Sequence, residues 1–176
     1  MKRFVPALVA AGLALGVGCS SSPDKGELVR EPATTRARLD AFEDAVSIVF
    51  EKRCGSLDCH GNTERNMRIY SANGTRLPND AGLRTGTGDT SEDERLANYH
   101  SIMGLEPERT RDVLAGADPY ELLVLKKPLG IESHKGGQPI RRGDDAEQCI
   151  VSWLRADAAT TVDLNACARA SIFPKE

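Results

Sequence analysis

The sequence is poor in aromatic side chains, which make up 5% of its 176 residues and include a single tryptophan. With so few large side chains, a conventional core is modest, and we expect another group to fill part of the interior. The sequence also lacks a basic excess, because 23 lysines and arginines stand against 26 aspartates and glutamates, for a net charge of −3. This acidic balance gives no sign of a surface that binds nucleic acid.

Several patterns are missing as well. No segment alternates between apolar and polar residues for the length of a strand, and there is no internal repeat. Beyond the N-terminus, no apolar run is long enough to cross a membrane. We find no nucleophile set beside a base, no phosphate-binding loop and no pair of catalytic carboxylates. These absences indicate an all-α protein that is not an enzyme, with no small-molecule substrate.

The N-terminus is strongly apolar. Lys2 and Arg3 precede a run of apolar and small residues that leads to Cys19, which is the order of a secretory signal. The letters "LGVGC" resemble the lipobox of bacterial lipoproteins, in which the cysteine receives a diacylglycerol. The resemblance implies lipidation of Cys19, and Ser20 after it resembles lipoproteins sent to the outer membrane. The alternative is an ordinary signal peptide with a chance cysteine.

Domain boundaries follow from this segment. We expect a lipoprotein signal peptide at residues 1–18, a flexible tether at 19–33 and one domain at 34–176. Loss of the signal removes two basic residues and changes the net charge from −3 to −5. The expected location is the bacterial cell envelope, where the lipid anchor holds the protein to the outer membrane, facing the periplasm. Cysteines there are not kept reduced, so disulfides and thioether-linked haem are both possible.

Helical periodicity is the main signal for structure in the rest of the chain. Apolar residues recur at steps of three and four before the first cysteine pair, and three later helices begin with capping-box patterns. Polar, turn-rich text at 61–90 and 129–143 predicts long loops. The predicted helices cover 34–54, 91–104, a short stretch within 107–116, 118–128 and 144–154.

Residues 54–61 read "CGSLDCHG". A histidine directly after the second of two cysteines is the pattern of haem c attachment, although that signal has two residues between the cysteines and this stretch has four. Attachment needs two thiols that reach the two vinyl groups of the porphyrin and a histidine held beneath the iron. Cys54, Cys59 and His60 are therefore candidates for haem binding, with His60 as an iron ligand. A disulfide between Cys54 and Cys59 is the alternative.

The surroundings of this motif carry a family resemblance. "IVFEKRCGSLDCHGN" looks like the attachment region of cytochrome c-like domains, and "DPYELLVLKKPLGIESHKGGQPIRRGDDAEQCIVSWL" is similar to the C-terminal half of the planctomycete-type cytochrome c domain. That family places a histidine–glycine–glycine loop before a helix that carries a tryptophan. The chain departs from the pattern in its cysteine spacing and at Lys135, where glycine is more usual. The resemblance implies a small cytochrome c-like helical domain with long loops around one covalent haem c.

A second iron ligand is expected opposite the first. His134 precedes Gly136 and Gly137, and glycines let a backbone come close to a ring. The family resemblance points to the same histidine. Met103 is the alternative ligand, and His100 is a third candidate on the same predicted helix.

Two cysteines remain for a structural role. Cys149 lies on the apolar side of the last predicted helix, and Cys167 stands in a tail able to fold back to it. One proposal pairs Cys149 with Cys167 and leaves the other two for haem. The rival proposal places all four cysteines in disulfides.

The leading hypothesis is a membrane-anchored, single-haem cytochrome c-like lipoprotein that exchanges electrons with a redox partner protein. One alternative is a haem-free, disulfide-stapled lipoprotein that serves as a binding or assembly module. Another is a subunit whose haem serves a separate catalytic partner.

Overall fold

The computed structural model describes residues 38–78, 82, 88–157 and 159–172. The expected signal peptide, the lipidated Cys19 and the tether lie outside these residues. The described residues contain helices, turns and loops and no strand, so the all-α prediction is confirmed. None of their helices is long and apolar enough to span a membrane.

The first predicted helix is present over its described part. The chain is helical from Arg38, passes through a π-helical turn, η1 (Phe42–Val46), and continues as α2 (Ser47–Cys54). The sequence did not predict the π turn. The apolar residues at steps of three and four face inward, as the periodicity requires. The buried members of this series are Phe42, Val46, Val49 and Phe50.

The remaining helices follow after the first long loop. In four of them the capping residue accepts a hydrogen bond from a backbone N–H of the first turn, which satisfies a donor left open at a helix start; these residues are Ser91, Asp118, Asp144 and Asp163. The elements are α3 (Glu92–Met103), α4 (Pro107–Leu114), the 3₁₀ turn η2 (Pro119–Glu121), α5 (Leu123–Lys126), α6 (Asp145–Arg155) and α7 (Leu164–Ala170).

The capping predictions had mixed outcomes. Ser91 and Glu94 form the complete capping box, each bonded to the backbone N–H of the other. The single helix predicted over 118–128 is wrong, because Leu122 is extended with ψ of 138° and divides the segment into η2 and α5. The tail also differs from the prediction, since it contains α7, whose first turn is capped by Asp163.

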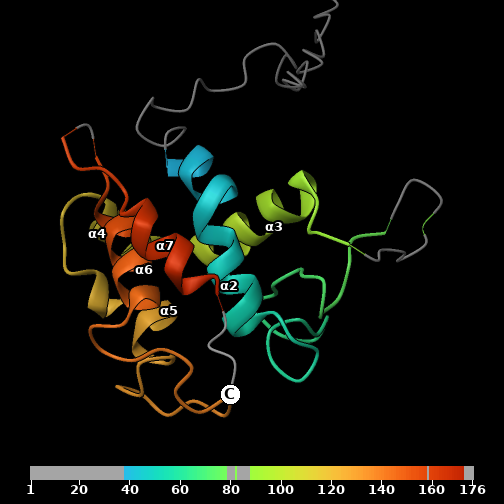
Figure 1. Ribbon diagram of the computed structural model, residues 1–176. Coiled ribbons are helices and arrows are strands. Elements are labelled where there is room, and N and C mark those ends of the chain that lie inside the picture. Colours follow the sequence, from blue (N-terminus) through green and yellow to red (C-terminus); the bar gives the residue numbers. More distant parts are fainter. Residues whose placement is uncertain (1–37, 79–81, 83–87, 158, 173–176) are drawn as a thin grey trace, which may run out of the picture. The chain divides into compact units, whose positions relative to one another are not determined.

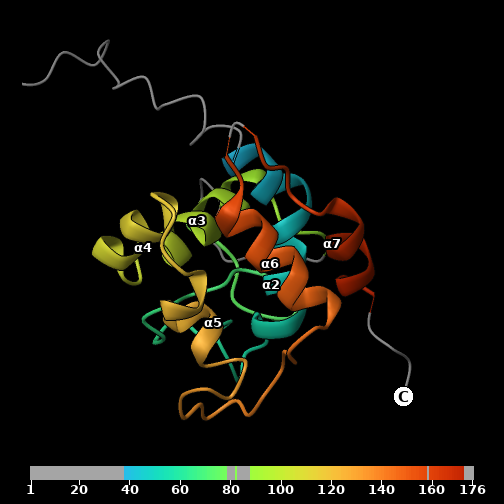
Figure 2. The ribbon, with the colours of Figure 1, turned by 90° about the vertical axis from the view of Figure 1, so that its left-hand side faces the viewer.

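An aromatic cluster joins the helices at the centre of the core. The Trp153 ring of α6 lies 5.1 Å from the Phe42 ring of η1, and Tyr99 of α3 packs edge-on against both. Because α6 and α7 also pack on η1, the first and last helices share one core (Figures 1 and 2). With Phe50, which also packs on Phe42 and Trp153, the cluster contains four of the eight aromatic side chains of the sequence. The loops at the C-terminal end of α2 and after α5 lie together at the lower end of both views.

Candidate functional site

The first loop of the site is the turn that follows α2. The backbone N–H of His60 donates to the carbonyl of Cys54 at 2.9 Å, so the chain returns to the helix end after the five residues that separate them. Gly61 N–H closes the turn by donating to Ser56 O at 2.8 Å. Ser56, Leu57 and Asp58, which lie between the two cysteines, are exposed. The extra two residues of the motif thus bulge outward and leave His60 beside the end of α2.

Three glycines allow this turn to close. A Cβ at Gly61 would collide with the carbonyl of Gly55 and lie 2.7 Å from Ser56 O. A Cβ at Gly74 would collide with the same carbonyl and lie 2.9 Å from the Cα of Gly61. Gly55, Gly61 and Gly74 therefore pack backbone against backbone, at distances that no larger residue permits.

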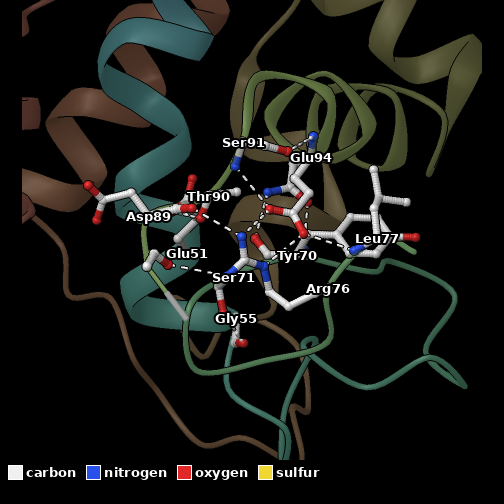
Figure 3. Close-up of polar contacts among 12 residues, drawn as sticks. Glu51, Gly55, Tyr70, Ser71, Arg76, Leu77, Asp89, Thr90, Ser91 and Glu94 are labelled. Atoms are coloured by element: carbon white, nitrogen blue, oxygen red, sulfur yellow. Dashed lines mark hydrogen bonds and ion pairs between the residues drawn. The ribbon is translucent and has the colours of Figure 1, made fainter. Parts of the chain in front are cut away.

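A polar network supports the turn from behind (Figure 3). The Ser71 hydroxyl donates to Gly55 O at 2.5 Å, and the Thr90 hydroxyl donates to Glu51 of α2 at 2.6 Å. At the start of α3, the Arg76 guanidinium contacts both carboxylate oxygens of Glu94 at 2.8 Å. These contacts hold the end of α2, the loop after it and α3 together, and no sequence motif predicts them.

His60 is oriented by a backbone carbonyl. Its Nδ1 lies 2.7 Å from Met67 O, and because a carbonyl oxygen only accepts hydrogen bonds, Nδ1 carries the proton and donates. Burial lowers the pKa of His60; the bond to Met67 opposes this, and the positive potentials of His134 and Arg65 add to it. The neutral imidazole, with the lone pair on Nε2, is the form that binds a metal.

His134 is oriented in the same way from the loop after α5. Its Nδ1 donates to Gly137 O at 2.9 Å, and Gly137 N–H returns a bond to His134 O at 3.1 Å. Gly137 has φ of +70°, a conformation that favours glycine. A Cβ at Gly136 would lie 3.1 Å from the ring carbon Cε1 of His134. The histidine–glycine–glycine stretch thus forms a compact turn against the imidazole.

The ring centres of the two imidazoles lie at a distance that one metal ion bound by both Nε2 atoms would give. Their ring centres are 6.1 Å apart, and their planes differ by 16°. Two metal–nitrogen bonds of about 2 Å, with about 1 Å from each nitrogen to its ring centre, give about 6 Å between the centres. Among the described residues neither Nε2 has a hydrogen-bond partner, so both remain available as ligands.

A cleft of two adjoining hollows surrounds the histidine pair. One hollow has a volume of about 410 Å³ and a largely apolar wall, and the other has about 440 Å³ and is more polar. Each falls within the range of ligand pockets, which is about 300–1,000 Å³. The apolar wall is formed by Phe50, Cys54, Met67, Leu105, Leu123, Val124 and Pro128. A flat apolar ring system with a central metal fits these surroundings.

The candidate attachment cysteines line this cleft from two sides. Cys54 lines the apolar hollow and Cys59 the polar one, and the structure shows both as free thiols without a mutual disulfide. Burial, with a smaller effect from Cys59, raises the pKa of Cys54 to about 12, so its thiol is protonated at neutral pH. The motif therefore brings Cys54, Cys59 and His60 to one cleft despite its wider spacing.

The other candidate ligands lie elsewhere. Met103 packs against the core and lines a separate small cavity of about 10 Å³. His100 is exposed on α3, where its ring packs against Tyr99. Neither residue lines the cleft around His60 and His134.

The remaining cysteines form the expected bridge. Cys149 of α6 and Cys167 of α7 are joined by a disulfide, and both are fully buried. The bridge lies on the helices and does not line the cleft.

Two cleft residues were not among the candidate site residues named from the sequence. Arg65 belongs to no motif, and Lys127 is one of several basic residues near His134. Both line both hollows. The available signal was weak: Arg65 lies five residues after the motif histidine in an otherwise featureless loop.

Comparison of the chain with protein-family models, with curated proteins and with solved structures found no significant match. Any function assigned to the chain therefore rests on the residues and geometry of the cleft.

Proposed function

We propose that this chain is a membrane-anchored, c-type cytochrome-like lipoprotein that binds one haem covalently and transfers electrons. The observation that carries the proposal is the pair of nearly parallel imidazoles, 6.1 Å apart, whose Nδ1 atoms are both occupied by backbone carbonyls. A metal-binding histidine commonly donates its other ring N–H to such an acceptor, which fixes the tautomer and the ring orientation. The cysteine–histidine order of the motif and the apolar wall support haem as the group that carries the metal.

Each part of the cleft has a role in this proposal. His60 and His134 hold the iron through Nε2, and the apolar wall excludes water from the ring system. Cys54 and Cys59 supply the thioethers: each thiol adds across a vinyl group, with sulfur bonding to one carbon and hydrogen to the other. When bound, haem supplies reversible one-electron chemistry, and two histidine ligands give a lower potential than histidine with methionine.

The anchor and the partner complete the proposal. Cys19, outside the described residues, carries the lipid that holds the domain at the outer membrane, facing the periplasm. A redox partner protein in the same compartment exchanges electrons with the haem.

The direct test is to express the exported protein together with a haem maturation system. We expect a reduced alpha band, haem that stays on the chain in a denaturing gel, and a low-spin spectrum. Because nearly parallel imidazoles give a rhombic low-spin signal in electron paramagnetic resonance, that signal reports the 16° angle between the rings. A colourless folded product would refute the proposal.

A ligand variant sharpens the test. His134→Ala is expected to abolish the bis-histidine spectrum and change the reduction potential. His100→Ala is the matched control, because His100 is exposed on α3 and does not line the cleft. An unchanged spectrum in His134→Ala would remove this residue as a ligand.

The second candidate function is a haem-free lipoprotein, stapled by a disulfide, that acts as a binding or assembly module. The observation that favours it is the thiol of Cys54, which is buried and protonated, since the thiolate is the nucleophilic form. In that case the exported protein carries the Cys149–Cys167 bridge, stays colourless and has Cys54 and Cys59 as titratable free thiols.

A further inference from the structure

The two hollows of the cleft meet at four side chains. Among the described residues, those that line both hollows are His60, His134, Arg65 and Lys127. Two imidazoles and two cations therefore stand at the same junction. A haem has a metal at its centre and two propionate carboxylates along one edge, so the junction presents one cation for each carboxylate.

Both cations lack a carboxylate partner within the described part of the chain. Arg65 donates only to backbone carbonyls, from Nε to Cys59 O at 3.3 Å and from a terminal nitrogen to Asp58 O at 3.5 Å. Lys127 donates to the carbonyl of Ser133 at 3.2 Å. These hydrogen bonds are long. They also leave N–H groups of both side chains without an acceptor in them, since arginine has five N–H groups and lysine three.

Neighbouring cations behave differently. Lys126, next to Lys127, lies 3.0 Å from Glu121, and Arg142 lies 3.4 Å from Glu147. Arg65 and Lys127 thus differ from Lys126 and Arg142 in lining both hollows and in having no described carboxylate within ion-pair distance.

We infer that Arg65 and Lys127 bind the two propionates of the haem and so fix its orientation in the cleft. The inference rests on the proposed function, and it adds residues that hold the acidic edge of the group. A guanidinium suits a carboxylate because two parallel N–H bonds match its two oxygens, whereas an ammonium acts as a point charge. Other charged side chains that line the cleft are Asp58, Glu64 and Lys135.

Binding of the propionates by the two cations affects the reduction potential of the haem. Positive charge near the propionates offsets their negative charge and favours the reduced form, in which the iron carries one positive charge fewer. Loss of either cation is therefore expected to disfavour reduction about threefold to tenfold, and tenfold corresponds to about 59 mV for a one-electron couple.

The test uses the haem-loaded protein with Arg65→Gln and Lys127→Gln. Two readouts are compared with wild type: the reduction potential and the propionate bending bands of the resonance Raman spectrum. We expect each variant to keep the bis-histidine spectrum, lower the potential and shift one propionate band. Arg65→Lys and Lys127→Arg keep the charge and should restore the potential, even if a glutamine variant matures poorly.

Two controls decide what a change means. Lys52→Gln removes a charge from an exposed position of α2 that does not line the cleft, and it should leave the propionate bands unchanged. Lys135→Gln removes the cation that lines only the polar hollow. If Lys135→Gln alone moves the bands, or if neither glutamine variant does, the inference is wrong. A wild-type protein without haem would instead be a failure of the proposed function.

Discussion

The imidazole orientations at this site depend on which atom each Nδ1 faces. His60 Nδ1 donates to Met67 O and His134 Nδ1 donates to Gly137 O, so Nε2 is the ring nitrogen that keeps its lone pair on each imidazole. His60 is tied to a loop anchored on α2, because its N–H also bonds to Cys54 O. His134 is oriented within its own exposed turn. The orientation of the His134 ring therefore depends on the residues immediately beside it in the sequence.

Gly136 is the residue most closely placed against the His134 ring. In Gly136→Ala, the new Cβ would lie 3.1 Å from Cε1, so the ring must turn or shift. We expect a changed rhombicity of the low-spin electron paramagnetic resonance signal, with haem content retained.

Gly130→Ala is the matched control for this prediction. Gly130 lies in the same loop with φ of +71°, and its Cβ would meet only the Gln138 side chain, at 3.4 Å or more. This variant should lose stability without changing the signal. Equal spectra for Gly136→Ala and wild type would show that the ring is not confined there.

The turn after α2 brings Cys54, Cys59 and His60 to one cleft despite the wide spacing of the cysteines. Its closure requires Gly55, Gly61 and Gly74 to pack without side chains, while Ser71 and the Arg76–Glu94 pair hold it from behind. The turn is therefore a rigid support for His60.

Gly61→Ala should damage this turn strongly. The added Cβ would press on the carbonyls of Gly55 and Ser56, and backbone cannot move aside as a flexible side chain does. We expect a loss of about 3 kcal/mol in the free energy of unfolding, measured in urea. Gly116→Ala, in open space at φ of +108°, should lose only about 1–2 kcal/mol. Similar losses for the two variants would contradict the tight packing.

Glu94 gives the support an acid-sensitive component. Burial raises the pKa of Glu94, but hydrogen bonds from Arg76 and from the backbone of Ser91 and Leu77 outweigh this and lower it. A lowered folded-state pKa means that the stabilisation is fully present above the unfolded value of about 4.3 and is lost as the pH falls through the folded value.

Glu94→Gln should therefore cost about 3 kcal/mol at pH 7, because Arg76 is left in a largely buried site without its carboxylate. In urea titrations, the difference from wild type should shrink as the pH falls below about 4. Glu92→Gln, exposed in the first turn of α3, should stay within about 0.5 kcal/mol of wild type. A difference for Glu94→Gln that is constant with pH would exclude the proposed charge effect.

Helices were easier to predict than the structure of the loops. Periodicity predicted the first helix and α6, and the Ser91–Glu94 pattern predicted the start of α3. The break at Leu122 was missed because Asp118 and Pro119 signal any helical start, including a single 3₁₀ turn.

The histidines of the cleft were named from the sequence, but their geometry was not available there. The hydrogen bonds to the backbone carbonyls of Met67 and Gly137 cannot be predicted from the residue types at these positions. Nor does the contact between Gly61 and Gly74, which tertiary structure alone brings together.

At the scale of the whole molecule, the C-terminal helices close the fold over the first ones. α6 supplies Trp153 to the aromatic cluster, and α7 packs on α6 and η1 (Figure 2). The disulfide between Cys149 and Cys167 joins these last two helices, and the two cysteines are 18 residues apart in the sequence.

Loss of this bridge should destabilise the protein without altering the cleft. A loop of this length restricts the unfolded chain by about 3 kcal/mol. Cys149→Ala with Cys167→Ala should lower the free energy of unfolding by about that amount, measured in urea. Reduced wild-type protein serves as the control and should show a similar loss. A spectrum that also changed would contradict the separation of bridge and cleft.

The carbonyl acceptors of Met67 and Gly137 have a genetic consequence. Every residue type has a backbone carbonyl, so a substitution at position 67 that preserves the fold, such as Met67→Leu, cannot delete the acceptor. Position 137 is constrained instead by its backbone conformation, with φ of +70°. We therefore expect position 67 to tolerate many apolar residues and position 137 to tolerate few substitutions. The two positions differ in this way although each provides a backbone carbonyl that accepts a hydrogen bond from a histidine.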